Sequence, residues 1–263
     1  MSDKIKAVFL DVDGTIRSLK TKTIPPSALE AISAARKRGV LVFLATSRAV
    51  QFLNNVEGIV EYDGVVALTG AHCIDSERVT ISTEAMDQSD VRAYVKYCDE
   101  HANPLVAYAS DRIFVLQPGH PYLVASMNLG GVKYDRFLPF DDAFSDRILQ
   151  FTAFFHAGEE EARVMAMMPH SHTERWHPEF TDILHNGANK GTGLRNMAAH
   201  FGIPVEQTLA MGDGGNDVPM LEAAGIGVAM GNAKPDVQAR ADYVTADCDD
   251  DGLCKAFAHF GII

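Results

Sequence analysis

The chain has 263 residues, of which 47% are hydrophobic and 22% charged, and its formal net charge is −12. This composition is typical of a folded globular protein and excludes a disordered or fibrous chain. The acidic balance disfavours nucleic acid and anionic membranes as partners. No apolar signal-peptide core follows Met1–Lys6, and no apolar run approaches the ~18–20 residues of a membrane-spanning helix.

The first apolar run, Lys6–Leu10, predicts a buried strand of a parallel sheet. It ends in two carboxylates, Asp11 and Asp13, which Gly14 and Thr15 follow. Carboxylates directly after a buried strand are costly unless something compensates their charge. Taken alone, the segment also fits an ordinary turn with a helix N-cap, and it becomes a candidate functional site only together with the polar segments further along the chain.

A helix and a second buried strand come next. Ser27 and Glu30 have the spacing of a capping box, and Gly39 is a typical helix stop. The apolar run Val40–Ala45 predicts the next strand. Both strands then end at the same edge of a parallel sheet, which is where ligands bind in open α/β sheets. The second strand ends in three polar residues, Thr46, Ser47 and Arg48.

The pattern changes between residues 83 and 185, where helical segments stand beside short hairpins. This mixture predicts an α+β domain with an antiparallel sheet, inserted into an α/β core formed by residues 1–82 and 186–263. Helices are predicted over 89–101, 121–128 and 159–167, and strands over 105–108, 113–116, 148–155, 173–176 and 180–184. His170 and His172 have the spacing of a metal pair, but no third ligand is evident, so zinc is not expected.

The α/β alternation returns at the C-terminal end. Lys190 lies near the start of a helix predicted to reach His200, where its charge adds to the anion-attracting helix terminus. The apolar run Thr208–Met211 predicts another buried strand, and the sequence Gly212-Asp213-Gly214-Gly215-Asn216-Asp217 follows it. A helix over 218–224, a strand over 226–230, a short helix over 236–241 and an edge strand over 243–245 complete the prediction.

Four polar segments of the chain resemble the four motifs of the haloacid dehalogenase superfamily of phosphatases. They are Asp11–Thr15, Thr46-Ser47, Lys190 and Gly212–Asp217. Their order and spacing are most similar to the Cof-type sugar-phosphatase branch, which carries a large C2-type cap between the second and third motifs. The resemblance implies a Rossmann-like core with a parallel sheet and an inserted cap that selects the substrate. Ser47 departs from the pattern, because the branch usually has glycine there.

The resemblance also implies roles for the carboxylates. Asp11 is the nucleophile that forms an aspartyl-phosphate, and Asp13 protonates the leaving oxygen and later deprotonates water. Mg²⁺ would be held by the Asp11 and Asp213 carboxylates and the Asp13 backbone carbonyl. Asp217 would act outside the first ligand shell, through water or by orienting Lys190.

The remaining motif residues are assigned to the phosphoryl group. Arg48 is open between a substrate or phosphate contact and an ion pair on a helix surface, whereas Arg17 is expected at the surface. In the inserted domain, Arg112, His156, Arg175 and His177 are candidate substrate contacts. The residues implied to bind phosphate are Val12, Thr46, Ser47, Lys190 and Asn216.

The leading hypothesis is a Mg²⁺-dependent phosphatase of a small phosphorylated metabolite, with no obligate protein partner. A phosphosugar mutase is the alternative, but it needs groups for a second phosphate, and the inserted domain shows no clear basic pair. A non-catalytic phosphoester-binding protein is disfavoured because every position of the motifs is filled. The four cysteines (Cys73, Cys98, Cys248 and Cys254) form no Cys-x-x-Cys pair, which predicts buried thiols in a cytoplasmic protein.

Overall fold

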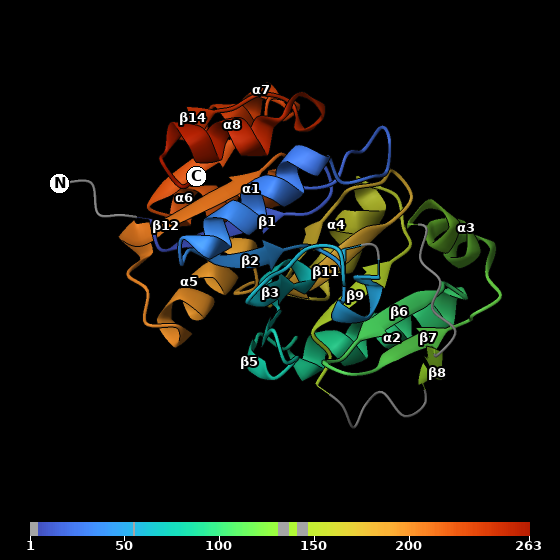
Figure 1. Ribbon diagram of the computed structural model, residues 1–263. Coiled ribbons are helices and arrows are strands. Elements are labelled where there is room, and N and C mark those ends of the chain that lie inside the picture. Colours follow the sequence, from blue (N-terminus) through green and yellow to red (C-terminus); the bar gives the residue numbers. More distant parts are fainter. Residues whose placement is uncertain (1–4, 55, 131–136, 141–146) are drawn as a thin grey trace. The chain divides into compact units, whose positions relative to one another are not determined.

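The computed structural model describes residues 5–54, 56–130, 137–140 and 147–263 (Figure 1). The chain forms two compact units. The core unit comprises Met1–Ser82 and Asn189–Ile263, and the inserted unit comprises Thr83–Ala188. The first boundary lies where the sequence places it, and the second lies three residues after the expected one at 185/186.

The core unit contains an eight-stranded sheet in the order β14-β13-β12-β1-β2-β3-β4-β5. The six strands from β14 to β3 are parallel, and β4 is antiparallel to β3. Because β1 lies between β2 and β12, the strand order reverses beside it, and this is where ligands bind in such sheets. The strands are β1 (Ala7–Asp11), β2 (Leu41–Ala45), β3 (Gly64–Ala67), β4 (His72–Asp75), β5 (Thr80–Thr83), β12 (Thr208–Gly212), β13 (Ile226–Ala229) and β14 (Tyr243–Val244).

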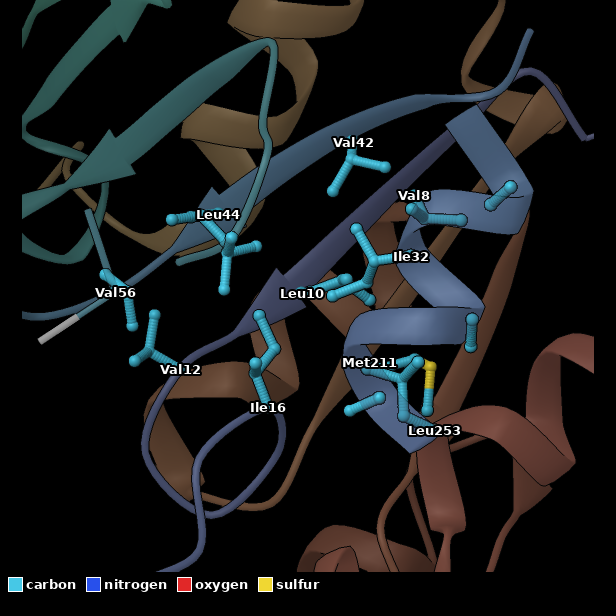
Figure 2. Close-up of a cluster of buried hydrophobic side chains, with 14 of the residues drawn as sticks. Val8, Leu10, Val12, Ile16, Ile32, Val42, Leu44, Val56, Met211 and Leu253 are labelled. Atoms are coloured by element: carbon cyan, nitrogen blue, oxygen red, sulfur yellow. The ribbon is translucent and has the colours of Figure 1, made fainter. Parts of the chain in front are cut away.

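Helices cover both faces of this sheet, as the continuous apolar strands predict. On one face, Val8 and Leu10 of β1 pack with Ile32 of α1 (Pro26–Lys37) and Leu253 of α8 (Gly252–His259), and Figure 2 shows this cluster. The two helices are neighbours in Figure 1. The opposite face packs against α5 (Lys190–His200), α6 (Val218–Ala223) and α7 (Pro235–Gln238). Single 3-10 turns are η1 (Val50–Phe52), η2 (Leu68–Gly70), η4 (Val205–Gln207), η5 (Gly215–Asp217) and η6 (Cys248–Asp250).

The predicted capping box at the start of α1 is wrong. The helix begins at Pro26, and its N-cap residue Pro25 has no side-chain hydrogen bond to the helix. Proline suits the first helical position because its φ is already helical and its missing N–H would have no partner there. Ser27 lies inside the helix, and its hydroxyl donates to Asp251 Oδ1 over 2.6 Å. The predicted stop is confirmed, since the helix ends at Lys37 just before Gly39.

The inserted unit contains a six-stranded sheet in the order β10-β11-β9-β6-β7-β8. Its pairs are antiparallel except for the parallel pair β7–β8, so the predicted α+β class is confirmed. Strand β8 (Phe137–Pro139) was not predicted, and β9 (Gln150–Ala153) is shorter than expected. The other elements are α2 (Gln88–His101), β6 (Leu105–Tyr108), β7 (Ile113–Leu116), α3 (Pro121–Gly130), α4 (Glu159–Ala166), β10 (Ser171–Glu174) and β11 (Thr181–His185).

The apolar core of the inserted unit lies between α2, α4 and one face of this sheet. Phe151 of β9 and Ile183 of β11 pack there with Val91 and Tyr94 of α2 and Val164 of α4. Strand residues alternate between faces, so Gln150, Thr152 and Asp182 belong to the opposite face.

All four cysteines are free thiols. Burial raises the pKa of Cys98 and that of Cys248 to about 12, so these thiols are unreactive at neutral pH. In the part of the chain that the structure describes, no helix combines the length and the apolar character needed to span a membrane.

Candidate active site

A cluster of carboxylates lies at the carboxyl edge of the core sheet. Asp11 ends β1, and Asp213 directly follows the neighbouring strand β12. One carboxylate oxygen from each of Asp11, Asp213 and Asp217 lies within 4.8 Å of the others. The sheet therefore brings together the first and last of the sequence-predicted motifs, which lie about 200 residues apart in the chain.

A completely buried lysine joins two of these carboxylates. Lys190 is the first residue of α5, whose N-cap residue Asn189 accepts a hydrogen bond from the Thr192 N–H. The Lys190 Nζ atom lies 2.6 Å from Asp11 Oδ1 and 2.6 Å from Asp217 Oδ1. Burial alone would lower the pKa of Lys190, but the charges of Asp11 and Asp217 outweigh it and raise that pKa. Lys190 is therefore a fixed positive charge at the site.

The cluster carries more negative charge than the lysine neutralises. Burial, followed by the charge of Asp217, raises the pKa of Asp11 well above its usual value, although Lys190 opposes this. The same two causes raise the pKa of Asp213 to about 6. Three carboxylates and one ammonium group leave two negative charges, which one divalent cation would neutralise. The oxygen donors suit Mg²⁺, so the residues present fit the expected metal.

Asp217 has both carboxylate oxygens engaged. Its Oδ1 accepts from Lys190, and its Oδ2 accepts the backbone N–H groups of Asp213 over 2.9 Å and Gly214 over 2.8 Å. The sequence left open whether Asp217 acts through water or by orienting Lys190, and these contacts favour the orienting role. Asp217 fixes Lys190 and the loop that carries Asp213.

Asp213 is held by two further residues. Thr15 Oγ1 donates to its Oδ1 over 3.4 Å, and Asn232 Nδ2 donates to its Oδ2 over 3.2 Å. Asn232 also donates to the Gly14 carbonyl over 2.9 Å, which ties the first motif to the last. Asn232 was not predicted from the sequence. A signal was available, because Asn232 follows the apolar run of β13 just as Asp213 follows that of β12.

Asp13 has a different environment from Asp11. Its Oδ1 accepts from Arg17 Nη1 over 2.8 Å, and its Oδ2 accepts from Arg48 Nε over 2.8 Å. The expectation that Arg17 lies at the surface is wrong, since its side chain is only 15% exposed and pairs with Asp13. Arg48 lies in the loop after β2 and pairs with Asp13, so the alternative of an ion pair on a helix surface is wrong, and its contact with substrate or phosphate stays a prediction. The two carboxylates of the first motif thus face separate cations.

The other candidate phosphate ligands surround this edge. Thr46 is buried directly after β2, and its Oγ1 accepts the Arg48 N–H over 3.1 Å. The Val12 side chain lies in the hydrophobic cluster of Figure 2, so only its backbone is left for a phosphate. Ser47 lies in the loop after β2, Asn216 lies in η5, and both are partly exposed.

A second group of potential metal ligands lies in the inserted unit, and it includes His170 with Asp87 and Asp90 but not His172. The buried Asp90 already accepts from the His170 N–H over 3.0 Å and from Ser171 Oγ over 2.7 Å. Asp87 caps α2 through the Ser89 N–H. These contacts give the carboxylates a structural role.

Comparison with known proteins gives a consistent result. The family model of haloacid dehalogenase-like hydrolases matches residues 8–257. YkrA of Bacillus subtilis (strain 168) is 31% identical over 261 residues, which are 98% of each chain. Among solved structures, the phosphatase BT1666 of Bacteroides thetaiotaomicron is 35% identical, with a TM-score of 0.88 over 99% of this chain and 96% of its own. The subclass IIB sugar phosphatase BT4131 is 38% identical, with a TM-score of 0.88 over 98% of this chain and all of its own (100%). Together with the four motifs at one sheet edge, these matches establish that the chain belongs to the haloacid dehalogenase-like hydrolases and is a phosphatase.

Proposed function

We propose that the protein hydrolyses the phosphate monoester of a small metabolite, such as a sugar phosphate, with Mg²⁺ and through an aspartyl-phosphate on Asp11. The observation that carries this proposal is the buried Lys190–Asp11 contact of 2.6 Å beside Asp213 and Asp217. This contact fixes a carboxylate oxygen of Asp11 at the sheet edge. It also places the positive charge of Lys190 beside that oxygen, where it would stabilise the negative charge of a phosphoryl group.

The residues of the chain can perform both halves of the reaction. A carboxylate oxygen of Asp11 attacks phosphorus, the bond from phosphorus to the ester oxygen breaks, and Asp13 gives its proton to the departing oxygen. Water then attacks the phosphorus of the aspartyl-phosphate and gives a proton to Asp13. Phosphate leaves, and the Asp11 carboxylate is restored. Lys190 stabilises the charge on the phosphoryl oxygens.

Further residues would hold the phosphoryl group and the metal. The Thr46 hydroxyl, Ser47, Asn216 and the Val12 backbone would bind phosphoryl oxygens. The Asp11 and Asp213 carboxylates with the Asp13 carbonyl would hold Mg²⁺, which supplies charge neutralisation when bound. The free cysteines support the cytoplasmic location expected from the sequence.

Phosphate release from a panel of phosphorylated metabolites tests the function. We expect turnover with Mg²⁺, complete loss in EDTA and recovery when Mg²⁺ is returned. Ca²⁺ should inhibit, because its looser and higher coordination misplaces the attacking Asp11 oxygen. Full activity after thorough removal of metal would exclude this mechanism.

Substitution of Gly14 tests whether the position of Asp213 matters. Gly14 has φ +99°, and a Cβ there would lie 2.2 Å from Asp213 Oδ2. We expect Gly14→Ala to displace that carboxylate and to lower kcat/KM by about 100-fold, since small misplacements in an active site have effects of this order.

Gly39→Ala is the matched control for this substitution. Gly39 has φ +81° with nothing within 4 Å of a Cβ, so its replacement adds comparable backbone strain without a collision. It should lower stability and leave kcat/KM of the folded protein unchanged. Equal kcat/KM values for the two variants would contradict the assignment.

A further inference from the structure

The loop after β13 contributes an asparagine that joins the loops of three neighbouring strands. Strands β14, β13, β12 and β1 are consecutive and parallel in the core sheet, so their carboxyl ends lie at one edge. Asn232 follows β13 at this edge. The residues bonded to its side chain are Gly14 after β1, Asp213 after β12 and Cys248 after β14. One side chain therefore contacts the loops of all the other strands in this set.

The three partners of Asn232 fix the orientation of its amide. The backbone N–H of Cys248 can only donate, and the amide oxygen Oδ1 accepts it over 2.9 Å. The Gly14 carbonyl and the Asp213 carboxylate can only accept, and Nδ2 donates to them over 2.9 and 3.2 Å. The amide nitrogen thus uses both of its hydrogens. Turning the amide over would break all three hydrogen bonds, so Asn232 has a single orientation, in which it holds Asp213 Oδ2.

The backbone that carries Asn232 is held as well. Gln238 Nε2 of α7 donates to the carbonyls of Gly231 and Ala233, on either side of Asn232, over 3.2 and 3.0 Å. A Cβ at Gly231 would lie 2.6 Å from the Asp247 backbone nitrogen, so glycine lets this loop lie against the segment after β14. Asn232 is therefore attached to a fixed support, as a residue that orients a functional group must be.

The position of Asp213 depends on Asn232 and on the backbone that Asn232 holds. Thr15 Oγ1 lies 3.4 Å from Asp213 Oδ1, longer than the usual hydroxyl hydrogen bond of about 2.5–3.0 Å. The Asn232 contact with Oδ2, at 3.2 Å, is within the range for N–H donors. A Cβ on Gly14 would lie 2.2 Å from the same Oδ2, so that oxygen lies directly against Gly14. Because Asn232 also bonds the Gly14 carbonyl, it fixes both the carboxylate and the surface on which the carboxylate lies.

Asn232 holds Asp213 without neutralising it, unlike the partners of the other carboxylates at the site. Asp11 and Asp217 share a lysine, and Asp13 pairs with two arginines. In the part of the chain that the structure describes, Asp213 forms no ion pair with a lysine or arginine, and its side-chain donors are a hydroxyl and an amide. A neutral donor orients a carboxylate and leaves its negative charge for a divalent cation, which prefers charged oxygen ligands.

We propose that Asn232 is a positioning residue for the metal ligand Asp213, which it orients while leaving the charge of that carboxylate available to Mg²⁺. The inference rests on the metal-dependent function proposed above. Asn232 acts through Asp213 and has no assigned contact with the substrate.

Titration of the full chain with MgCl₂ in a calorimeter, without substrate, tests this role. Asn232→Ala removes both donors and should raise the Kd for Mg²⁺ by about 10- to 100-fold, the usual effect of losing a residue that orients a metal ligand. Asn232→Leu keeps the number and branching of the side-chain heavy atoms but cannot donate, so it should weaken Mg²⁺ binding similarly. Circular dichroism checks that both variants are folded. If folded Asn232→Ala binds Mg²⁺ as tightly as wild type, the proposal is wrong.

Asn196→Ala is the matched control. Asn196 lies in α5 of the same unit and is also partly exposed, and its Nδ2 donates to Ser82 Oγ over 3.2 Å, the same length as the Asn232–Asp213 bond. Its replacement should leave the Kd for Mg²⁺ unchanged. An equal loss of Mg²⁺ affinity in this variant would mean that any lost side-chain amide has this effect, which contradicts a specific role for Asn232.

Hydrolysis of 4-nitrophenyl phosphate at a series of Mg²⁺ concentrations separates positioning from a general loss of stability. Asn232→Ala should raise the Mg²⁺ concentration for half-maximal activity by the same factor as the Kd, with KM for the ester at saturating Mg²⁺ unchanged, because Asn232 does not contact substrate. A wild-type phosphatase whose activation by Mg²⁺ is unaffected by Asn232→Ala would keep the proposed function and overturn the inference. A wild-type chain that binds Mg²⁺ in an Asn232-dependent way but hydrolyses no phosphate ester would support the positioning role and contradict the proposed function.

Discussion

Replacing Lys190 with methionine is expected to lower the free energy of unfolding by about 3–5 kcal/mol, the usual effect of removing one partner of a buried ion pair. Methionine has a similar length but carries no charge, so Asp11 and Asp217 would stay buried without the ammonium group that lies 2.6 Å from each. Urea denaturation followed by circular dichroism, at neutral pH and without Mg²⁺, measures this effect. Phosphatase activity should be lost as well, since the phosphoryl group loses its buried cation.

Two further variants show whether burial is the cause. Lys20→Met removes a lysine that pairs with Asp247 and Asp249 at the surface, with 71% of its side chain exposed, so the unfolding midpoint should hardly change. The double variant Lys190→Met with Asp217→Asn removes one of the stranded charges. It should recover part of the stability but none of the activity. A Lys190→Met protein as stable as wild type would show that this ion pair does not stabilise the core.

Five strands of the core sheet (β1, β2, β12, β13 and β14) could be predicted because they follow from local patterns, whereas β3, β4 and β5 were not predicted. Continuous apolar runs predict buried parallel strands, and parallel strands that end at one edge bring Asp11 and Asp213 together whatever their separation in sequence. The contacts of individual side chains could not be predicted in this way. Arg17 lies in the loop after β1, where no periodicity applies, and its contact with Asp13 depends on the path of that loop.

The inserted unit shows the same limit at the level of strands. The hairpin of β6 and β7 is local, so its turn residues reveal it. Strand β8 pairs with β7 only after the chain has passed through α3, and three residues give too short a pattern to recognise. The burial of Asp182 depends on the packing around its strand, which the order of residues in Thr181–His185 does not encode.

The two aspartates of the first motif should differ sharply when each is replaced by asparagine. Asp11→Asn removes the attacking oxygen, so we expect no covalent intermediate and a loss of activity on the order of 10⁶-fold, as for other covalent nucleophiles. Asp13 binds Arg17 and Arg48 rather than Lys190, and its assigned metal ligand is the backbone carbonyl. Asp13→Asn should therefore keep Mg²⁺ affinity and lose about 10²- to 10⁴-fold, the usual contribution of general acid–base catalysis.

The leaving group distinguishes this role from a structural one. A departing alkoxide needs a proton, whereas an aryl oxide, whose phenol has a low pKa, needs little help. Asp13→Asn should therefore slow the phosphorylation of Asp11 by an alkyl phosphate much more than its phosphorylation by an aryl phosphate. Asp11→Asn should abolish both reactions, because nucleophilic attack precedes any difference between leaving groups. Single-turnover rates on the two esters, with folding checked by circular dichroism, provide the comparison. If Asp13→Asn slows phosphorylation by both esters equally, Asp13 is not the proton donor, and its ion pairs with Arg17 and Arg48 serve only to hold the loop after β1.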